Sequence, residues 1–211
     1  YGIGIQCHSS VSHSLMEATM YSAFMHKSYL LKRQAIAMTG KFRFYDPNGQ
    51  LVLFSEQKMF KLREDIRVYS DESKSQEVLS IKARQIVDFS AAYDVVDATN
   101  NEHVGTLRRK GLRSMLRDEW EVLNADGQVI GLLFEDSMGL AMLRRLLLGN
   151  FLPQNYDISM GESRVADLKQ RFNLFRYELD LDFTMDAANM LDRRLGLAAG
   201  ILLAAVEGRQ S

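Results

Sequence analysis

The stretch RLGLAAGILLAAVEG, Arg194–Gly208, is the least polar part of this 211-residue chain. Leu195–Val206 contains no polar side chain, and Gly196 and Gly200 have the spacing with which transmembrane helices pack closely. A spanning helix needs about 20 mostly apolar residues, whereas runs of about 10–14 are typical of buried core helices. Charged residues flank the run on both sides. The stretch therefore predicts a helix buried in the core of a fold rather than a membrane anchor.

The composition is that of an ordinary globular protein, with 46% hydrophobic and 25% charged residues. A net charge of −1 gives no overall field that would attract nucleic acid, so we expect no nucleic-acid partner. Cys7 is the single cysteine, which predicts a chain without internal disulfides in a reducing, cytoplasmic compartment.

The N-terminal residues 1–24 have no apolar period and read as a poorly structured leader without the features of a signal peptide. Cys7, His8 and His13 lack the paired spacing of a zinc site, so we expect neither a metal nor another cofactor there.

Two segments predict β-hairpins with the same turn chemistry. FYDPNGQLVLF, Phe44–Phe54, and LNADGQVIGLLF, Leu123–Phe134, each place Asp or Asn at the first turn position and Gly at the fourth. This pattern suits a type I turn followed by a residue with positive φ. A third hairpin with a longer polar loop begins at Tyr93.

Further strands complete a set of about a dozen, mostly connected by hairpins. In FRYELDLDF, Phe175–Phe183, apolar and charged residues alternate strictly, so this strand has one buried and one solvated face. The other strand signals lie at Tyr29–Lys32, Ile66–Tyr69, Val78–Arg84, Tyr156–Met160 and Val165–Lys169.

Two helices are predicted. Ser137–Leu148 has Leu and Met on one arc and Arg144 and Arg145 on the other, which is typical of a helix lying on a sheet. The second runs from Met185 to Val206, with Thr184 as its N-cap.

About a dozen antiparallel strands can remove their edges by closing into a barrel. Such a barrel is too wide for side chains alone to fill, and an α-helix about 10–12 Å across fits the space. We therefore predict a mainly β fold, a closed antiparallel barrel with the hydrophobic C-terminal helix threaded through its centre.

Over residues 25–207 the chain resembles the Tubby C-terminal-like superfamily, in particular the LURP-one-related proteins and the phospholipid scramblases. The resemblance lies in the pattern and order of four segments: GKFRFYDPNGQLVL from Gly40, YDVVDATNNEHVGTLRRKG from Tyr93, WEVLNADGQVIGLL from Trp120 and LDLDFTMDAANML from Leu179. It implies a closed 12-stranded barrel around the C-terminal helix. It also implies a non-enzymatic protein whose relatives are linked to phosphoinositide binding, membrane tethering or lipid scrambling.

A basic cluster follows the third hairpin and is the candidate site for a phosphate-bearing ligand. Its members are Arg108, Arg109, Lys110, Arg113 and Arg117. Arginine side chains suit phosphate groups, so we expect an adaptor or binding module that contacts anionic phospholipid, phosphoinositide or a protein partner at this rim, without a transmembrane span.

Two other readings stay open. The chain is a scramblase-like protein if its C-terminal helix lies in a bilayer. The carboxylates Glu178, Asp180 and Asp182, which share one face of a strand, are a weaker candidate for binding a cation. No nucleophile motif or phosphate-binding glycine loop occurs, and we expect no enzymatic activity and no catalytic residue.

Overall fold

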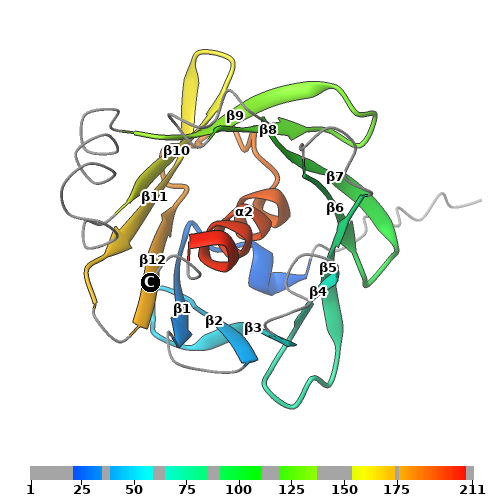
Figure 1. The fold of residues 1–211 in the computed structure, drawn as a ribbon, viewed down its shortest axis with the longest axis vertical. Helices are drawn as coiled ribbons and strands as arrows, with labels where there is room; N and C mark the ends of the chain where they lie inside the picture. The colour runs from blue at the N-terminus through cyan, green and yellow to red at the C-terminus, as the bar shows by residue number, and fades with distance from the viewer. Residues whose placement is uncertain are drawn as a thin grey trace, which may run out of the picture.

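The described residues form a closed β-barrel around the helix α2 (Figure 1). A computed structural model describes residues 21–34, 39–58, 65–84, 91–110, 119–136, 154–173 and 176–207. In these ranges the strands are β1 (Ser28–Gln34), β2 (Thr39–Tyr45), β3 (Leu51–Lys58), β4 (Asp65–Tyr69), β5 (Glu77–Ala83), β6 (Ala92–Asp97), β7 (Glu102–Arg109), β8 (Glu119–Leu123), β9 (Val129–Glu135), β10 (Asn155–Met160), β11 (Ser163–Arg171) and β12 (Arg176–Asp182). A short 3₁₀ helix, η1 (Ser22–Phe24), precedes them, and the helix α2 (Arg193–Glu207) follows.

Each strand pairs antiparallel with its neighbours in sequence, and β1 pairs with β12 to close the ring. Leu31 of β1 lies opposite Leu179 of β12 and Phe44 of β2, and all three side chains point inward. Closure gives each of these strands a hydrogen-bonded neighbour on both sides. The predicted fold class, a closed antiparallel barrel of about 12 strands, is confirmed.

The two short hairpins have the predicted turns. In each, the N–H of the glycine donates to the carbonyl of the first turn residue at 3.0 Å: Gly49 to Asp46, and Gly127 to Asn124. Both glycines have positive φ, 77° and 79°, which only glycine adopts without cost. The register shifts next to each turn, as it does in a bulged hairpin.

The helix α2 fills the lumen. Its apolar residues and the inward side chains of the strands form one continuous hydrophobic core. Gly196 lies against the ring of Phe183, and Gly200 lies against Leu181 of β12. The two glycines therefore allow a close approach between the helix and the wall.

The helix begins at Arg193 and not at Met185, which corrects the expected helix of residues 185–206. The carboxylate of Asp186 accepts hydrogen bonds from the backbone N–H groups of Met190 and Leu191, at 2.8 and 3.1 Å, and Asn189 has a positive φ of 51°. These turns replace the expected helical hydrogen bonds. Asp192 is the N-cap, because its carboxylate accepts the N–H of Arg194 at 2.9 Å.

A side chain of β1, that of Arg33, holds the C-terminal end of α2. Arg33 is 2% exposed, and its Nη1 donates to the carbonyl of Ala204 at 2.6 Å. A cation at the C-terminal carbonyls also offsets the negative end of the helix dipole. The guanidinium lies over the ring of Phe42, 5.7 Å from its centroid.

The core includes residues that precede the expected start of the domain at residue 25, because Ala23 and Phe24 of η1 are buried in it. Residues 21–24 thus belong to the fold rather than to the leader. Residues 1–20, and with them Cys7, His8 and His13, lie outside the described residues. The predicted helix at 137–148 also lies outside them.

Candidate functional site

The position of the helix inside the barrel determines which surfaces a partner can reach. A Cβ atom added to Gly196 would lie 2.5 Å from the Phe183 ring, and one added to Gly200 would lie 2.8 Å from Leu181. At these two glycines the helix therefore packs without spare space against β12 and against Phe183, which follows it. The outer wall and the two ends of the barrel remain as the surfaces that a ligand can reach.

A buried ionic cluster, which sequence reasoning missed, closes the end of the barrel where α2 begins. The guanidinium of Arg194 pairs with Asp97 at 2.8 Å, Glu102 at 2.7 Å and Asp192 at 2.7 Å. Burial by itself lowers the pKa of Arg194, but these carboxylates raise it above its usual value. In the local sequence, the one feature that could have indicated this cluster is an arginine directly before an apolar run. Its partners on β6 and β7 lie far away in sequence, and the ion pairs with them tie the start of the helix to the barrel wall.

The structure brings together the three described members of the basic cluster near the end of β7. Arg108 points outward and pairs with Glu121 of β8, with Nε at 2.7 Å and Nη2 at 2.6 Å from Oε2. Lys110 Nζ lies 2.5 Å from Glu119 and 3.9 Å from Glu121. The register of β7 and β8 causes this pairing, because Arg108 lies directly opposite Glu121.

Arg109 has a different environment from its neighbours. Its guanidinium lies 5.9 Å from the ring centroid of Trp120, a side chain that is buried in the barrel. Arg109 therefore belongs to the mouth of the barrel, whereas Arg108 and Lys110 lie on the outer rim. Arg113 and Arg117 lie outside the described residues.

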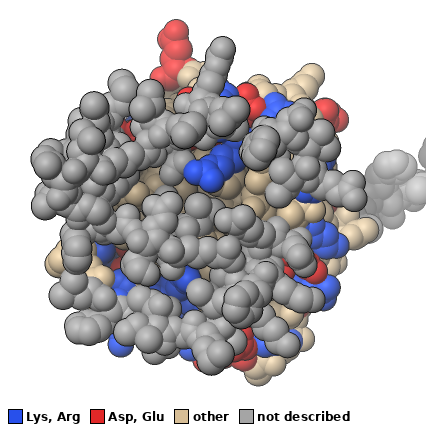
Figure 2. All heavy atoms as spheres, viewed as in Figure 1, with Lys and Arg blue, Asp and Glu red and all other residues tan. Residues whose placement is uncertain are grey.

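The rim is less positive than the sequence suggests, because Glu119 and Glu121 lie within the cluster. Even so, the side chains of Arg108 and Lys110 are 43% and 36% exposed. Figure 2 shows basic side chains at several places on the barrel end in view, with acidic side chains close to some of them. The rim is thus a mixed surface with an exposed basic edge.

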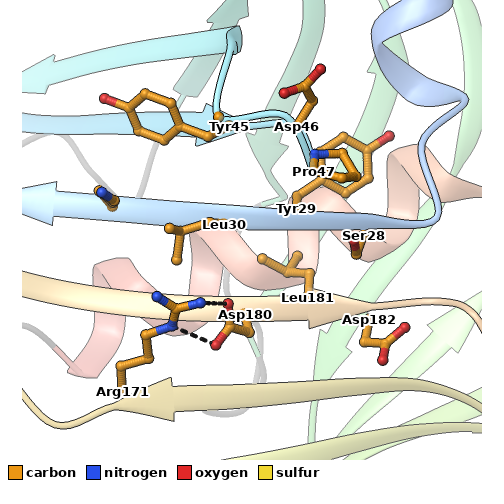
Figure 3. A pocket seen from close by; sticks show the side chains of 12 residues that line it. Ser28, Tyr29, Leu30, Tyr45, Asp46, Pro47, Arg171, Asp180, Leu181 and Asp182 are labelled. Atoms are coloured by element: carbon orange, nitrogen blue, oxygen red, sulfur yellow. Dashed lines mark hydrogen bonds and ion pairs between the residues drawn. The ribbon is translucent and has the colours of Figure 1, made fainter.

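The three carboxylates of β12 point outward on one face, as their alternation predicted, but they do not converge on a shared point. Asp180 is bound by Arg171 of β11 through two hydrogen bonds of 2.6 and 2.7 Å (Figure 3). Asp182 accepts the backbone N–H of Thr184 at 2.8 Å. Glu178 lies opposite Lys32 of β1 and Arg171 of β11.

No group of three or more His, Cys, Asp or Glu side chains is placed to hold a metal ion in the described part of the chain. The weak cation candidate at Glu178, Asp180 and Asp182 therefore gains no support from the geometry. Among the described helices, none has both the length and the apolar character needed to cross a membrane.

These observations define a class of protein, a closed 12-stranded barrel with a helix through its centre and charged groups on its outer surface. Residues 51–204 match the family model described as LURP-one-related, and the chain belongs to that family. The expected family is thereby confirmed, and the domain is a Tubby-like barrel.

The fold is shared with a solved structure. An X-ray structure of a protein from Arabidopsis thaliana superimposes with a TM-score of 0.50 at 12% sequence identity, covering 89% of this chain and 96% of that one. At this level of identity the likeness concerns the fold alone. No curated protein matches the chain.

Proposed function

We propose that this barrel is a non-enzymatic binding module that contacts an anionic phospholipid headgroup, or a similar phosphate-bearing ligand, through the basic rim. The observation that carries the proposal is the exposed, oriented guanidinium of Arg108. Its Nε and Nη2 atoms are directed at Glu121, which fixes the orientation of the planar group. The Nη1 side has no partner among the described residues and remains available to a phosphate oxygen.

The position of the helix supports this proposal over the scramblase-like alternative. The apolar residues of α2 are buried against the barrel wall, so a role in the bilayer would require them to leave the core. A surface contact needs no such rearrangement. Lys110, on the same rim, adds a second cation that reaches solvent.

Liposome flotation tests the proposal, with vesicles of neutral lipid alone and with a fraction of anionic lipid. The test variant combines Arg108→Gln and Lys110→Gln. Each basic group near an anionic surface contributes about 1 kcal/mol, so the double variant should bind roughly 30-fold more weakly at low salt. Binding by the unmodified protein should also weaken steeply with salt.

The matched control combines Arg67→Gln and Lys74→Gln. These exposed cations also pair with carboxylates but lie on β4 and on the turn that follows it. The control should bind as the unmodified protein does. Equal binding by the rim variant and the control, or binding that does not depend on anionic lipid, would contradict the proposal.

A further inference from the structure

The outer wall has a hollow that is separate from the basic rim. It is an open hollow with a volume of about 520 Å³, within the usual range of small-molecule sites, and lies over β2, β1, β12 and β11 (Figure 3). Leu30 lies between Tyr45 of β2 and Asp180 of β12 in the pairing of the strands and forms the apolar middle of the hollow. Pro47 of the β2–β3 turn also lines it.

Most of the charges that line the hollow are already engaged. Arg171 and Asp180 neutralise each other through their two hydrogen bonds. The carboxylate of Asp46 accepts the backbone N–H groups of Asn48 and Gln50, at 2.9 and 2.8 Å, within its own turn. Asp46 keeps its charge, but its second oxygen, Oδ2, is also engaged within that turn, by the side-chain N–H of Asn48 at 3.4 Å. The ammonium group of Lys32 and one carboxylate oxygen of Asp182 therefore remain for a ligand.

Lys32 turns away from the carboxylate that faces it across the strand pair. Its register partner on β12 is Glu178, but its ammonium group leans the other way, to 5.1 Å from the ring centroid of Tyr45. It makes no ion pair with any residue of the described ranges. An ammonium group held over an aromatic face keeps its charge and N–H groups available to an anion.

Asp182 is the matching anionic end. One carboxylate oxygen, Oδ1, accepts the backbone N–H of Thr184, and the other has no partner among the described residues. Its register partners are Ser28 on one side and Asp167 on the other. Asp167 is paired with Arg164 and Lys169, so these two cations are engaged there and not with Asp182.

The spacing of the two residues along the strands sets the length of a ligand. Lys32 lies four residues along β1 from Ser28, the register partner of Asp182. Four strand residues span about 13 Å. A single amino acid is too short to reach both groups, whereas an extended chain of about four residues covers the distance.

We propose that this hollow binds a short peptide of about four residues as a zwitterion, with its carboxylate at Lys32 and its ammonium group at Asp182. Leu30, Tyr45 and Pro47 contact its side chains. The two free charges of opposite sign exclude a simple anion, since such a ligand would leave Asp182 unpaired and close to a like charge. This site is independent of the basic rim and of the lipid proposed to bind there.

Tetra-alanine is the probe, followed by chemical-shift changes in NMR spectra of the whole chain. Two modified probes separate its ends: the N-acetyl peptide has no ammonium group, and the C-terminal amide has no carboxylate. The test variants are Lys32→Gln and Asp182→Asn, and Asn retains an oxygen for the Thr184 N–H. Lys82→Gln and Asp126→Asn are controls at exposed positions away from the hollow.

Each test variant should weaken tetra-alanine binding roughly tenfold, and the controls should leave it unchanged. The N-acetyl peptide should bind the unmodified protein and Asp182→Asn equally, because the partner of Asp182 is missing from the probe. The C-terminal amide should likewise bind Lys32→Gln and the unmodified protein equally, because the partner of Lys32 is missing from that probe. Thermal melts establish that the variants are folded.

Three results would overturn the proposal. The first is the absence of shifts at the hollow with millimolar tetra-alanine. The second is binding that neither test variant weakens. The third is an equal response of the free and the capped peptides to both variants, which would show that the termini are not what the hollow recognises.

Discussion

Substituting Gly196 by alanine should destabilise the barrel, although alanine is the better helix former. The added Cβ would lie 2.5 and 2.7 Å from two carbons of the Phe183 ring, closer than carbon atoms approach. The ring cannot move away easily. It is 1% exposed, packs edge-on against Tyr29 at 6.1 Å and lies under the guanidinium of Arg193 at 4.8 Å.

The size of the effect follows from two opposing contributions. Overpacking in a rigid core costs about 1–3 kcal/mol, and a wedged aromatic ring favours the upper end. Replacing glycine by alanine inside a helix recovers about 1 kcal/mol. We therefore expect a net loss of about 2 kcal/mol in the free energy of unfolding, which lowers the melting temperature by about 4–8 °C in a chain of this length.

Gly200→Ala is the matched comparison. Its Cβ would meet one methyl carbon of Leu181 at 2.8 Å, and the other two Leu181 atoms lie at 3.6 and 3.7 Å. The end of a leucine side chain can rotate, so the gain in helix propensity should cancel the strain. Urea unfolding and thermal melts of both variants measure the difference. A Gly196→Ala protein that melts at or above the unmodified one, or equal losses at both positions, would refute this reasoning.

Gly200→Leu should lower the melting temperature far more than Gly200→Ala, because the larger side chain must enter the same gap; an unchanged melt would mean that α2 is not enclosed. Arg194→Met should cost about 3–5 kcal/mol in urea unfolding, since it leaves the buried carboxylate of Asp97 unpaired; a loss below about 1 kcal/mol would contradict this. Burial by itself raises the pKa of Asp186, but its hydrogen bonds hold that pKa below the usual value. Its contribution is therefore present above pH of about 4 and lost as pH falls, so Asp186→Asn should flatten the acid side of the stability curve measured in urea. Deleting residues 1–19 should leave the melting temperature unchanged; a large drop would show that they cover part of the core.

Several parts of the fold could be predicted because they depend on local chemistry. The alternation in 175–183 predicted a strand with one buried face, and β12 spans Arg176–Asp182 with that pattern. The turn at Asp46 followed from a side chain that bonds its own backbone and a glycine with positive φ. The length of the apolar run placed the last helix in a core, and the number of strands implied a closed barrel.

The candidate sites were harder to predict, because charged side chains are assigned partners by the strand register. The sequence showed five basic residues close together, but not that Glu121 lies opposite Arg108 and binds it. In the same way, three alternating carboxylates suggested a cation site, but the sequence did not show that the neighbouring strand β11 places Arg171 on one of them, Asp180.

What the sequence by itself determined was the set of strands, their turns and an apolar helix narrow enough to be enclosed, since neighbouring residues specify these features. Only the tertiary structure decided how the helix is held and which charges stay free. Arg33 reaches Ala204 from 171 residues away, and Arg194 reaches Asp97 across 97. Such contacts exist only once the ring closes, because closure pairs β1 with β12 and encloses α2 within one core.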